Sequence, residues 1–506
     1  MYYGERVPYL HPGLGDSASQ QHLAVALKAL RDELELRTVF PPEVLAEAEA
    51  AVAAYEFPPK DLTGLDFITI DPPGSIDLDQ AVHLQRRGAG YRIWYAIADV
   101  PGFVRPGGAV DTEARLRGQT VYAPDGRISL HPEVIAEDAA SLLPGVVRGA
   151  YVWEFDLDSS AAVTTASVRR ASVRSRTQLT YAEVEEHLRS GGAPENLVLL
   201  REIGLKRIEL ELQRGGASLN LPAQEIGFER GRYFLMTAPA LPSEDWNAQI
   251  SLMTGMEAAR IMIEGRIGIL RTMPAPDEAA LAKFRSQAAA CGRAWPEGMA
   301  YGGFLRSLDT DRPEQLALMH AAASLFRGAG YTAFDGEVPD AVVQAAIAAP
   351  YAHTTAPLRR LVDRFVLVIC EALCAGRPVP QWARDALPDL NSLMAAANQA
   401  SARMESGAMD ALAAALLSDD VGKDFTAVVL AGSRPSNGDA GPRSRPSGTV
   451  QLIDPAIEAK CYGELTAGSL VTVRLVEADT ARRVVRFELA APAATGGLPV
   501  SAAPAG

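Results

Sequence analysis

The chain has 506 residues, enough for two or three domains, and its contents of hydrophobic (48%) and charged (22%) residues are ordinary for a globular protein. A formal net charge of −14 argues against a uniformly basic, DNA-coating surface but leaves room for a locally basic channel. The four cysteines form no CxxC pair, no run of 18 apolar residues occurs and no signal peptide opens the chain, so we expect a cytoplasmic protein with no membrane partner.

The first 60 residues have the pattern of a small helical domain. Residues 20–38 carry apolar side chains at the spacing of an amphipathic helix. Pro41 and Pro42 then precede a segment rich in Ala and Glu, and proline is favoured at the first position of a helix. We therefore expect two helices in residues 1–60.

An acidic loop follows at residues 67–80, FITIDPPGSIDLDQ. An apolar, β-branched run ends at Asp71, a Pro-Pro-Gly-Ser turn follows, and Asp77 and Asp79 come next, on the same side of an extended segment. Crowded carboxylates raise each other's pKa unless a cation lies among them, and Mg²⁺ is the ion that oxygen ligands of this kind suit. The loop predicts metal-dependent phosphate chemistry. A phosphatase of the haloacid dehalogenase type and a structural Ca²⁺ loop are alternatives, although the EF-hand ligand pattern is missing.

Residues 61–420 alternate strand and helix patterns and predict one large α+β domain. Thr180 with Glu183 three residues later is a capping box that predicts a helix start. Strands are predicted at residues 91–97 and 151–157, and helices at residues 180–189, 197–214, 248–268 and 395–417.

Residues 421–491 change character and predict an all-β domain, with strands at residues 425–430, 448–452, 470–475 and 483–489. Their spacing resembles an S1-type OB-fold barrel, which binds single-stranded RNA through a basic groove and stacking aromatic residues. Between the first two strands lies a Gly/Ser/Pro-rich loop with Arg434, Arg443 and Arg445, which is either an RNA backbone contact or a disordered insertion. Residues 492–506 are an Ala/Pro/Gly-rich tail expected to be disordered.

Four sequence blocks occur in one order, and together they are specific. The acidic loop resembles the signature TIDx₅DxDD of the RNase II (RNB) family of exoribonucleases. The later blocks resemble that family's hIADV, RGxSVYLPD…IPMLP…CSLxPG and YTHFTSPIRRYxD motifs: YAIADV at 95–100, RGQTVYAP at 117–124 with ISLHP at 128–132 and ASLLPG at 140–145, and YAHTTAPLRRLVD at 351–363. The similarity covers about residues 40–490.

The resemblance implies an RNB catalytic domain and a C-terminal S1 barrel. It implies processive 3′→5′ hydrolysis of single-stranded RNA to 5′-mononucleotides, with one or two Mg²⁺ ions that Mn²⁺ can replace. A monomer without an organic cofactor is expected.

The resemblance also implies residue roles. Asp71, Asp77 and Asp79 match the family's metal-binding aspartates, and Arg359 matches the arginine that holds the scissile phosphate. RNA-binding roles fall on Tyr122 and Phe228, which match aromatic residues that stack on terminal bases, on Arg360, and on Glu405 in ARME at 402–405. The residues also suggest a helix that starts at Pro357, in which Asp363 orients Arg359 from four positions away.

Two departures from the family pattern are visible. Gln80 stands at the fourth aspartate position, and a glutamine can still offer an oxygen to the metal but brings no charge. Gln80 is therefore kept as a fourth ligand, and the alternative is an RNB fold that binds RNA with impaired catalysis. In place of the usual cold-shock barrels stands the helical segment 1–60, either a helix-turn-helix-like RNA grip or a helical cap.

Overall fold

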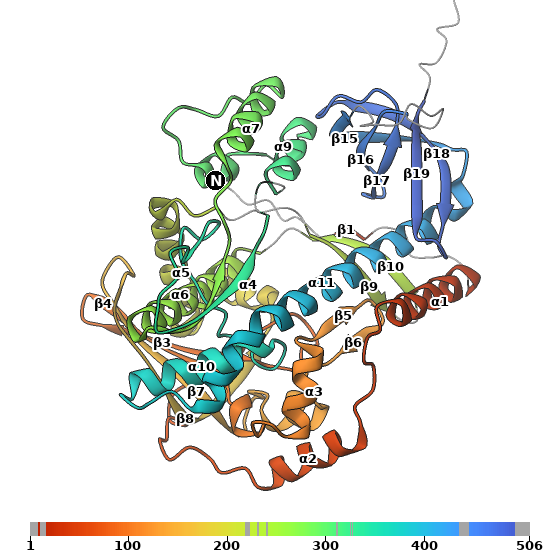
Figure 1. Ribbon diagram of the computed structural model, residues 1–506. Helices are drawn as coiled ribbons and strands as arrows, with labels where there is room; N and C mark the ends of the chain where they lie inside the picture. Colours follow the sequence, from red (N-terminus) through yellow and green to blue (C-terminus); the bar gives the residue numbers. More distant parts are fainter. Residues whose placement is uncertain are drawn as a thin grey trace, which may run out of the picture.

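The computed structural model describes residues 9–10, 17–217, 223–229, 232–238, 241–309, 312–323, 325, 327–434 and 445–490. Two closed β-barrels dominate it, with strand orders β2-β3-β4-β7-β8 and β15-β16-β17-β19-β18. The long helix α11 (Gln381–Leu417) runs from the helices beside the first barrel to the second barrel (Figure 1).

The first barrel is buried on both faces of its strands. Along β4, Ile93 and Tyr95 pack in a cluster shared with surrounding helices, whereas Ala96 packs in a second cluster with Phe67. Successive strand residues point to opposite faces, which explains why this strand has an almost unbroken apolar sequence. The strands are β2 (Phe67–Ile70), β3 (Gln80–Arg87), β4 (Gly90–Ala98), β7 (Val147–Leu157) and β8 (Val163–Leu179).

Helices pack against one side of this barrel. The capping box at Thr180 is confirmed, since Glu183 N donates to the Thr180 hydroxyl and Thr180 N donates to the Glu183 carboxylate. The helices are α4 (Tyr181–Arg189), α5 (Glu195–Arg214), α6 (Pro242–Gly265) and α10 (Leu361–Cys374).

Some predicted helix boundaries were wrong. The helix expected at residues 248–268 begins at Pro242 and ends at Gly265, because Arg266 takes a left-handed conformation with φ 57° and strand β11 (Ile267–Thr272) follows. The helix expected from residue 395 begins at Gln381 and continues through Pro388.

The second barrel confirms the all-β prediction and adds one strand to it. Strand β17 (Glu458–Tyr462) has no long apolar run, and it pairs in parallel with β19, a contact that local sequence does not specify. The other strands are β15 (Asp424–Arg434), β16 (Ser447–Leu452), β18 (Leu470–Asp479) and β19 (Val484–Leu489). The predicted architecture, a helical start, an α+β domain and a C-terminal all-β barrel, is confirmed.

The two N-terminal helices have different packing partners. Helix α1 (Ser17–Glu33) packs on α11, and its Leu23 and Leu27 belong to a hydrophobic cluster that continues through α11 into the second barrel. Helix α2 (Pro42–Ala53) packs through Val44 and Ala48 beside the first barrel, on α3. Among the described residues, each helix therefore belongs to a separate hydrophobic cluster, unlike the paired helices of a helix-turn-helix motif.

The remaining elements are short. Helices are α3 (Ala109–Arg117), α7 (Glu278–Ala290), α8 (Tyr301–Arg306) and α9 (Pro313–Ala323). Strands are β1 (Tyr9–Leu10), β5 (Val121–Ala123), β6 (Gly126–Ile128), β9 (Ala223–Glu229), β10 (Arg232–Ala238), β12 (Gly330–Asp335), β13 (Val343–Gln344) and β14 (Ala349–Pro350). Over the described part of the chain, none of the helices combines the length and hydropathy needed to span a membrane.

Candidate active site

The acidic loop joins β2 to β3 at one end of the first barrel. Its backbone is fixed from outside the loop: Leu78 N donates to the Ser141 hydroxyl at 2.9 Å, and that hydroxyl donates to the Ile76 carbonyl at 2.7 Å. The Gln178 amide donates to the Ser75 carbonyl at 2.8 Å. These bonds preorganise the loop, so its carboxylates have defined positions before any ligand arrives.

A cavity of about 480 Å³ opens over this loop. Its polar lining comes from four places in the chain: the acidic loop, the β5–β6 hairpin, the start of α4 and the segment before α10. The side chains concerned are Asp71, Asp77, Asp79, Gln80, Tyr122, Arg127, Tyr181 and Arg359. Six residues predicted for the site therefore lie around one cavity: the three aspartates, Gln80, Tyr122 and Arg359.

Asp79 connects the loop to Arg359. Its carboxylate accepts from Leu358 N at 2.8 Å and from Arg359 Nε at 3.2 Å. The Asp79 side chain is 6% exposed and that of Arg359 is 49% exposed, so the guanidinium has a free face toward the cavity. Burial raises the pKa of Asp79 to about 7, against the opposing charge of Arg359.

Asp77 is held by the β5–β6 hairpin. Arg127 donates to its carboxylate at 2.8 Å, and the Tyr122 hydroxyl lies 3.4 Å from it. Tyr122 and Arg127 are direct partners across the hairpin, and the Tyr122 ring is half exposed. Burial, followed by the charge of Asp77, raises the pKa of Tyr122 to about 12, so the hydroxyl keeps its proton.

The surroundings of Asp71 are the strongest structural indication of a metal site. One of its carboxylate oxygens, Oδ2, is buried without a hydrogen-bond partner within the described structure. Burial raises the pKa of Asp71 to about 6, the charge of Asp77 adds to this, and Arg359 opposes it. A buried carboxylate oxygen without a donor is the kind of group that a cation satisfies.

The three aspartates nevertheless do not converge on one point. No group of three His, Cys, Asp or Glu side chains among the described residues is arranged to hold a metal ion. Asp77 is turned toward Arg127 and Asp79 toward Arg359. Each carboxylate oxygen can still accept a second partner, so the donor set fits Mg²⁺ in kind, with Asp71 as the ligand that has an unpartnered oxygen.

Gln80 lines the cavity, but protein groups already contact its amide. The Tyr95 hydroxyl donates to its Oε1, and the Ser251 hydroxyl lies 3.3 Å from the same oxygen. Its Nε2 donates to the Thr355 carbonyl at 2.8 Å.

Arg360 and Asp363 correct one prediction. Asp363 was expected to orient Arg359 from within a helix that starts at Pro357. Helix α10 begins only at Leu361, and Asp363 pairs with Arg360 through two hydrogen bonds of 2.5 and 2.8 Å. The Asp363 carboxylate also accepts from Ala356 N at 2.8 Å, where a turn begins in which Arg360 N donates to the Ala356 carbonyl at 2.9 Å, and Arg359 is left to pair with Asp79.

Two predicted residues, Arg360 and Glu405, are absent from the cavity lining, and a third, Phe228, has a side chain outside the described part of the structure. Glu405 lies exposed on α11 and is absent from the cavity lining. Phe228 falls in β9, whose side chains lie outside the described part of the structure.

Arg127 and Tyr181 line the cavity without having been predicted. The turn Pro124-Asp125-Gly126 signals the hairpin that places Arg127 opposite Tyr122, and the capping box at Thr180 fixes where α4, and so Tyr181, begins.

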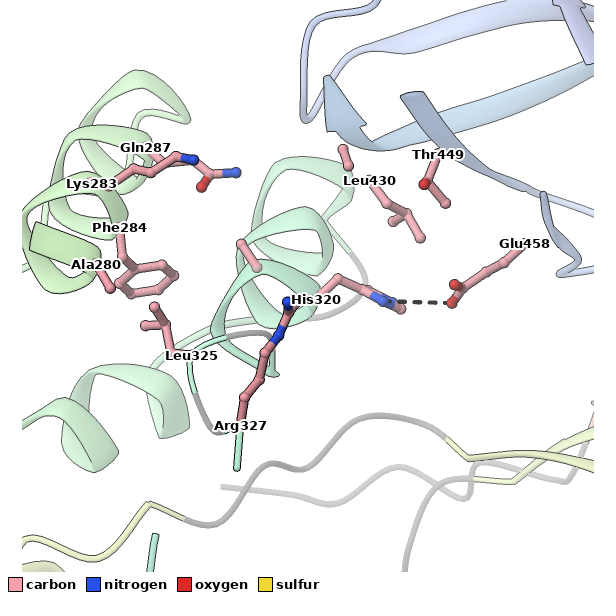
Figure 2. A pocket seen from close by; sticks show the side chains of 12 residues that line it. Ala280, Lys283, Phe284, Gln287, His320, Leu325, Arg327, Leu430, Thr449 and Glu458 are labelled. Carbon is pink, nitrogen blue, oxygen red and sulfur yellow. Dashed lines mark ion pairs between the residues drawn. The ribbon is translucent and has the colours of Figure 1, made fainter. Parts of the chain in front are cut away.

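A second cavity, of about 440 Å³, lies between α7, α9 and the second barrel (Figure 2). It is lined by apolar groups with Lys283 and Arg327, and His320 lies 3.5 Å from Glu458 across it. It shares no lining residue with the acidic cavity and has a single carboxylate, so it does not compete as the candidate active site.

The fold and the site define a two-barrel protein whose first barrel carries an acidic, arginine-faced cavity. Residues 59–376 match the RNB domain, and residues 423–490 match the RNase II-type exonuclease C-terminal S1 domain. The first match spans more than half of the chain, and the chain belongs to the RNB family.

Named relatives agree with this membership. Ribonuclease R of Escherichia coli (strain K12) is 30% identical over 320 residues, which cover 60% of this chain and 39% of that protein. The probable exosome complex exonuclease RRP44 of Caenorhabditis elegans is 27% identical over 330 residues, covering 61% and 34% of the two chains. The chain thus spans less than half of the length of these relatives.

Solved structures share the fold. Mycoplasma genitalium RNase R in complex with ribose methylated single-stranded RNA matches with a TM-score of 0.81 at 17% identity, over 94% of this chain and 79% of that one. Yeast Ssd1, described as a pseudonuclease, matches with a TM-score of 0.66 at 16% identity, over 92% and 59%.

Proposed function

We propose that this chain is a Mg²⁺-dependent hydrolytic 3′→5′ exoribonuclease that degrades single-stranded RNA processively to 5′-mononucleotides. The observation that carries the proposal is the single cavity in which the acidic loop faces Arg359. Metal-assisted phosphodiester hydrolysis uses two kinds of group: carboxylates that hold a divalent ion, and a guanidinium that is free to contact the phosphate.

Asp71, Asp77 and Asp79 are the proposed metal-binding residues. A bound Mg²⁺ ion supplies Lewis-acid stabilisation of charge on the phosphate and makes water a better nucleophile at neutral pH. The raised pKa values of Asp71 and Asp79 reflect burial that the charge of Arg359 offsets only in part, and a bound cation would add to that compensation. Mn²⁺, which prefers the same oxygen ligands, is expected to substitute.

Arg359 is the proposed phosphate-holding residue. Its Nε is bound to Asp79, which leaves the terminal nitrogens to donate to phosphate oxygens as negative charge develops. Because Asp79 contacts both Arg359 and the neighbouring Leu358 amide, one carboxylate aligns the arginine with the acidic loop.

Residues around the cavity are proposed to hold the RNA end. The half-exposed ring of Tyr122 is placed to stack on a base near the scissile bond, and Tyr181 lines the same cavity. Arg360, Phe228 and Glu405 stay predicted RNA contacts, although the first is paired with Asp363.

We propose a division into an N-terminal helical segment 1–60, an RNB catalytic domain 61–420, an S1 barrel 421–491 that contacts RNA, and a tail 492–506. We also propose that the protein acts as a monomer without an organic cofactor.

A second candidate is an RNA-binding protein that does not cut. It is favoured by Gln80, which removes one negative charge from the acidic loop, and by the likeness in fold to yeast Ssd1, a pseudonuclease. The retained aspartates and Arg359 favour activity.

Incubation of the protein with labelled poly(A), with Mg²⁺ or with EDTA, tests the proposal. A 3′→5′ exonuclease releases labelled mononucleotide at once from RNA labelled at its 3′ end, and it shortens 5′-labelled RNA stepwise. Binding without shortening under both conditions supports the second candidate and overturns the first.

A further inference from the structure

Gln80 occupies a closed polar network at the base of the cavity. Its Oε1 faces the Tyr95 and Ser251 hydroxyls, which lie 2.7 Å apart, so three oxygens share two hydroxyl protons. Tyr95 is fully buried, and burial raises the pKa of its hydroxyl well above the ordinary value, so the proton that it donates is retained. The carbonyl end of Gln80 is therefore directed at protein donors.

The other end of Gln80 reaches the segment that carries Arg359. Its Nε2 donates to the Thr355 carbonyl at 2.8 Å. This bond needs a donor on residue 80. A carboxylate at that position would put two acceptors face to face and would leave the Thr355 carbonyl without its partner.

The segment 355–360 forms a turn, with Arg360 N donating to the Ala356 carbonyl at 2.9 Å, and its backbone is also fixed by side chains and by Thr120 N from outside the segment. Gln80 holds the Thr355 carbonyl, Asp363 holds Ala356 N, Asp79 holds Leu358 N, and Thr120 N donates to the Arg359 carbonyl at 2.9 Å. Two of these anchors, Asp79 and Gln80, are neighbours in sequence, where the acidic loop meets β3. The acidic loop and the Arg359 segment are thus connected at two adjacent points.

We infer that Gln80 is a positioning residue for Arg359 and not a metal ligand, which leaves Asp71, Asp77 and Asp79 as the carboxylate set. The inference rests on the proposed function for its effect on turnover. It explains how a neutral residue can stand beside the acidic loop without disabling the site: the side chain contributes a donor that an aspartate lacks, and Tyr95 and Ser251 supply the hydroxyls that hold it.

The two roles predict opposite effects of Gln80→Glu. If Gln80 is a metal ligand, the substitution adds a negative charge to the metal site, so Mn²⁺ should bind more tightly. If Gln80 is a positioning residue, the substitution removes the donor to the Thr355 carbonyl. Turnover should then fall while the number and affinity of bound Mn²⁺ ions stay unchanged. Gln80→Met, which keeps the length and removes both polar atoms, should behave like Gln80→Glu under the positioning role.

The first measurement counts bound Mn²⁺ by electron paramagnetic resonance in the full chain without RNA. We expect Gln80→Met to keep the wild-type number of ions and their Kd, and Asp71→Asn to weaken Kd by about tenfold or more. Gln85→Glu, on the exposed part of the same strand, is the matched control for added charge. Loss of an ion in Gln80→Met, or tenfold tighter binding in Gln80→Glu, would overturn the inference.

The second measurement follows hydrogen exchange of amides 356–361 by mass spectrometry, together with turnover. We expect faster exchange in Gln80→Met and a kcat lower by about tenfold to a hundredfold, with RNA Kd unchanged. Tyr95→Phe, which removes one hydroxyl and keeps the ring, should give a smaller change in the same direction, and it carries the test if Gln80→Met does not fold. Wild-type exchange in both variants would overturn the positioning role. If the wild-type protein cleaves no RNA, the proposed function fails, but the Mn²⁺ count and the exchange rates still decide the role of Gln80.

Discussion

The two barrels have the same number of strands, and each has an aspartate paired with an arginine, but the pKa values of these two aspartates shift in opposite directions. In the first barrel, burial raises the pKa of Asp79 to about 7. In the second, Asp424 accepts two hydrogen bonds from Arg474 at the surface, and its pKa is lowered, first by those bonds and then by the arginine's charge. A carboxylate near a cation is thus costly to ionise in one barrel and easily ionised in the other, and burial makes the difference.

Ion pairs within the second barrel also reduce the number of free arginines that an RNA-binding groove on it could use. Its arginines are largely engaged with its own acids: Arg445 with Glu488, and Arg482 and Arg486 with Glu477. Lys460 differs, since its ammonium lies over the Tyr462 ring, 5.0 Å from the centroid. A lysine next to an aromatic ring is a pairing that can contact both the backbone and a base of single-stranded RNA.

The largest effect is expected from removing one buried acid of the first barrel. Asp79→Asn should lower kcat by at least about a hundredfold and leave RNA affinity nearly unchanged, because it removes a proposed metal ligand and the partner of Arg359. Single-turnover cleavage and filter binding measure the two quantities. Asp66→Asn, at a side chain that is 73% exposed before β2, is the control and should behave as wild type. Normal turnover in Asp79→Asn would remove Asp79 from the metal site.

The pH dependence of unfolding should reveal the same burial. Asp79 and Asp71 have folded pKa values near 7 and 6, above the ordinary 3.8, so the folded state binds their protons more tightly than the unfolded state does. Their contribution to stability is greatest below pH 4 and is lost as the pH rises toward 7, by up to about 1.4 kcal/mol per pH unit for each group. Urea unfolding in EDTA measures this slope, and Asp79→Asn should flatten it relative to Asp66→Asn. An equal slope in both variants would contradict the burial of Asp79.

A smaller effect is expected at the second barrel. Replacing Lys460 and Tyr462 by Ala should weaken binding of long RNA by about tenfold and reduce its salt dependence, while cleavage of short oligomers is kept. Lys423→Ala, at a lysine paired with Asp420, is the control. Point variants suit this test better than deletion, because the barrel interior shares a hydrophobic cluster with α1 and α11. Loss of short-oligomer cleavage would contradict the separate roles of the barrels.

The smallest effect on rate is expected at Tyr122. Tyr122→Ala should lengthen the final product by a few nucleotides with long-RNA affinity unchanged, because only the last bases reach the cavity. Denaturing gels resolve the end products. Tyr122→Phe keeps the ring and loses only the 3.4 Å contact to Asp77, so its product should match the wild type. Longer products from both variants would assign the effect to the hydroxyl rather than to stacking.

Local sequence determined much of the architecture. The capping box at Thr180, the apolar strand β4 and the short strands of the C-terminal segment are set by neighbouring residues, and each of these elements is present. The four motif blocks also named the aspartates, Tyr122 and Arg359, which line one cavity. Strand β17 was missed because its pairing with β19 supplies what its own sequence lacks.

Tertiary structure alone decided which partner each charged group takes. Asp363 binds Arg360, three positions before it, and Asp79 binds Arg359 from 280 positions away, a choice that helical spacing could not give because α10 begins only at Leu361. Gln80 reaches Thr355 across 275 positions. The sequence determines which donors and acceptors exist, but burial and the approach of distant segments determine which of them meet, since a buried polar group can pair only with a partner that the fold brings to it.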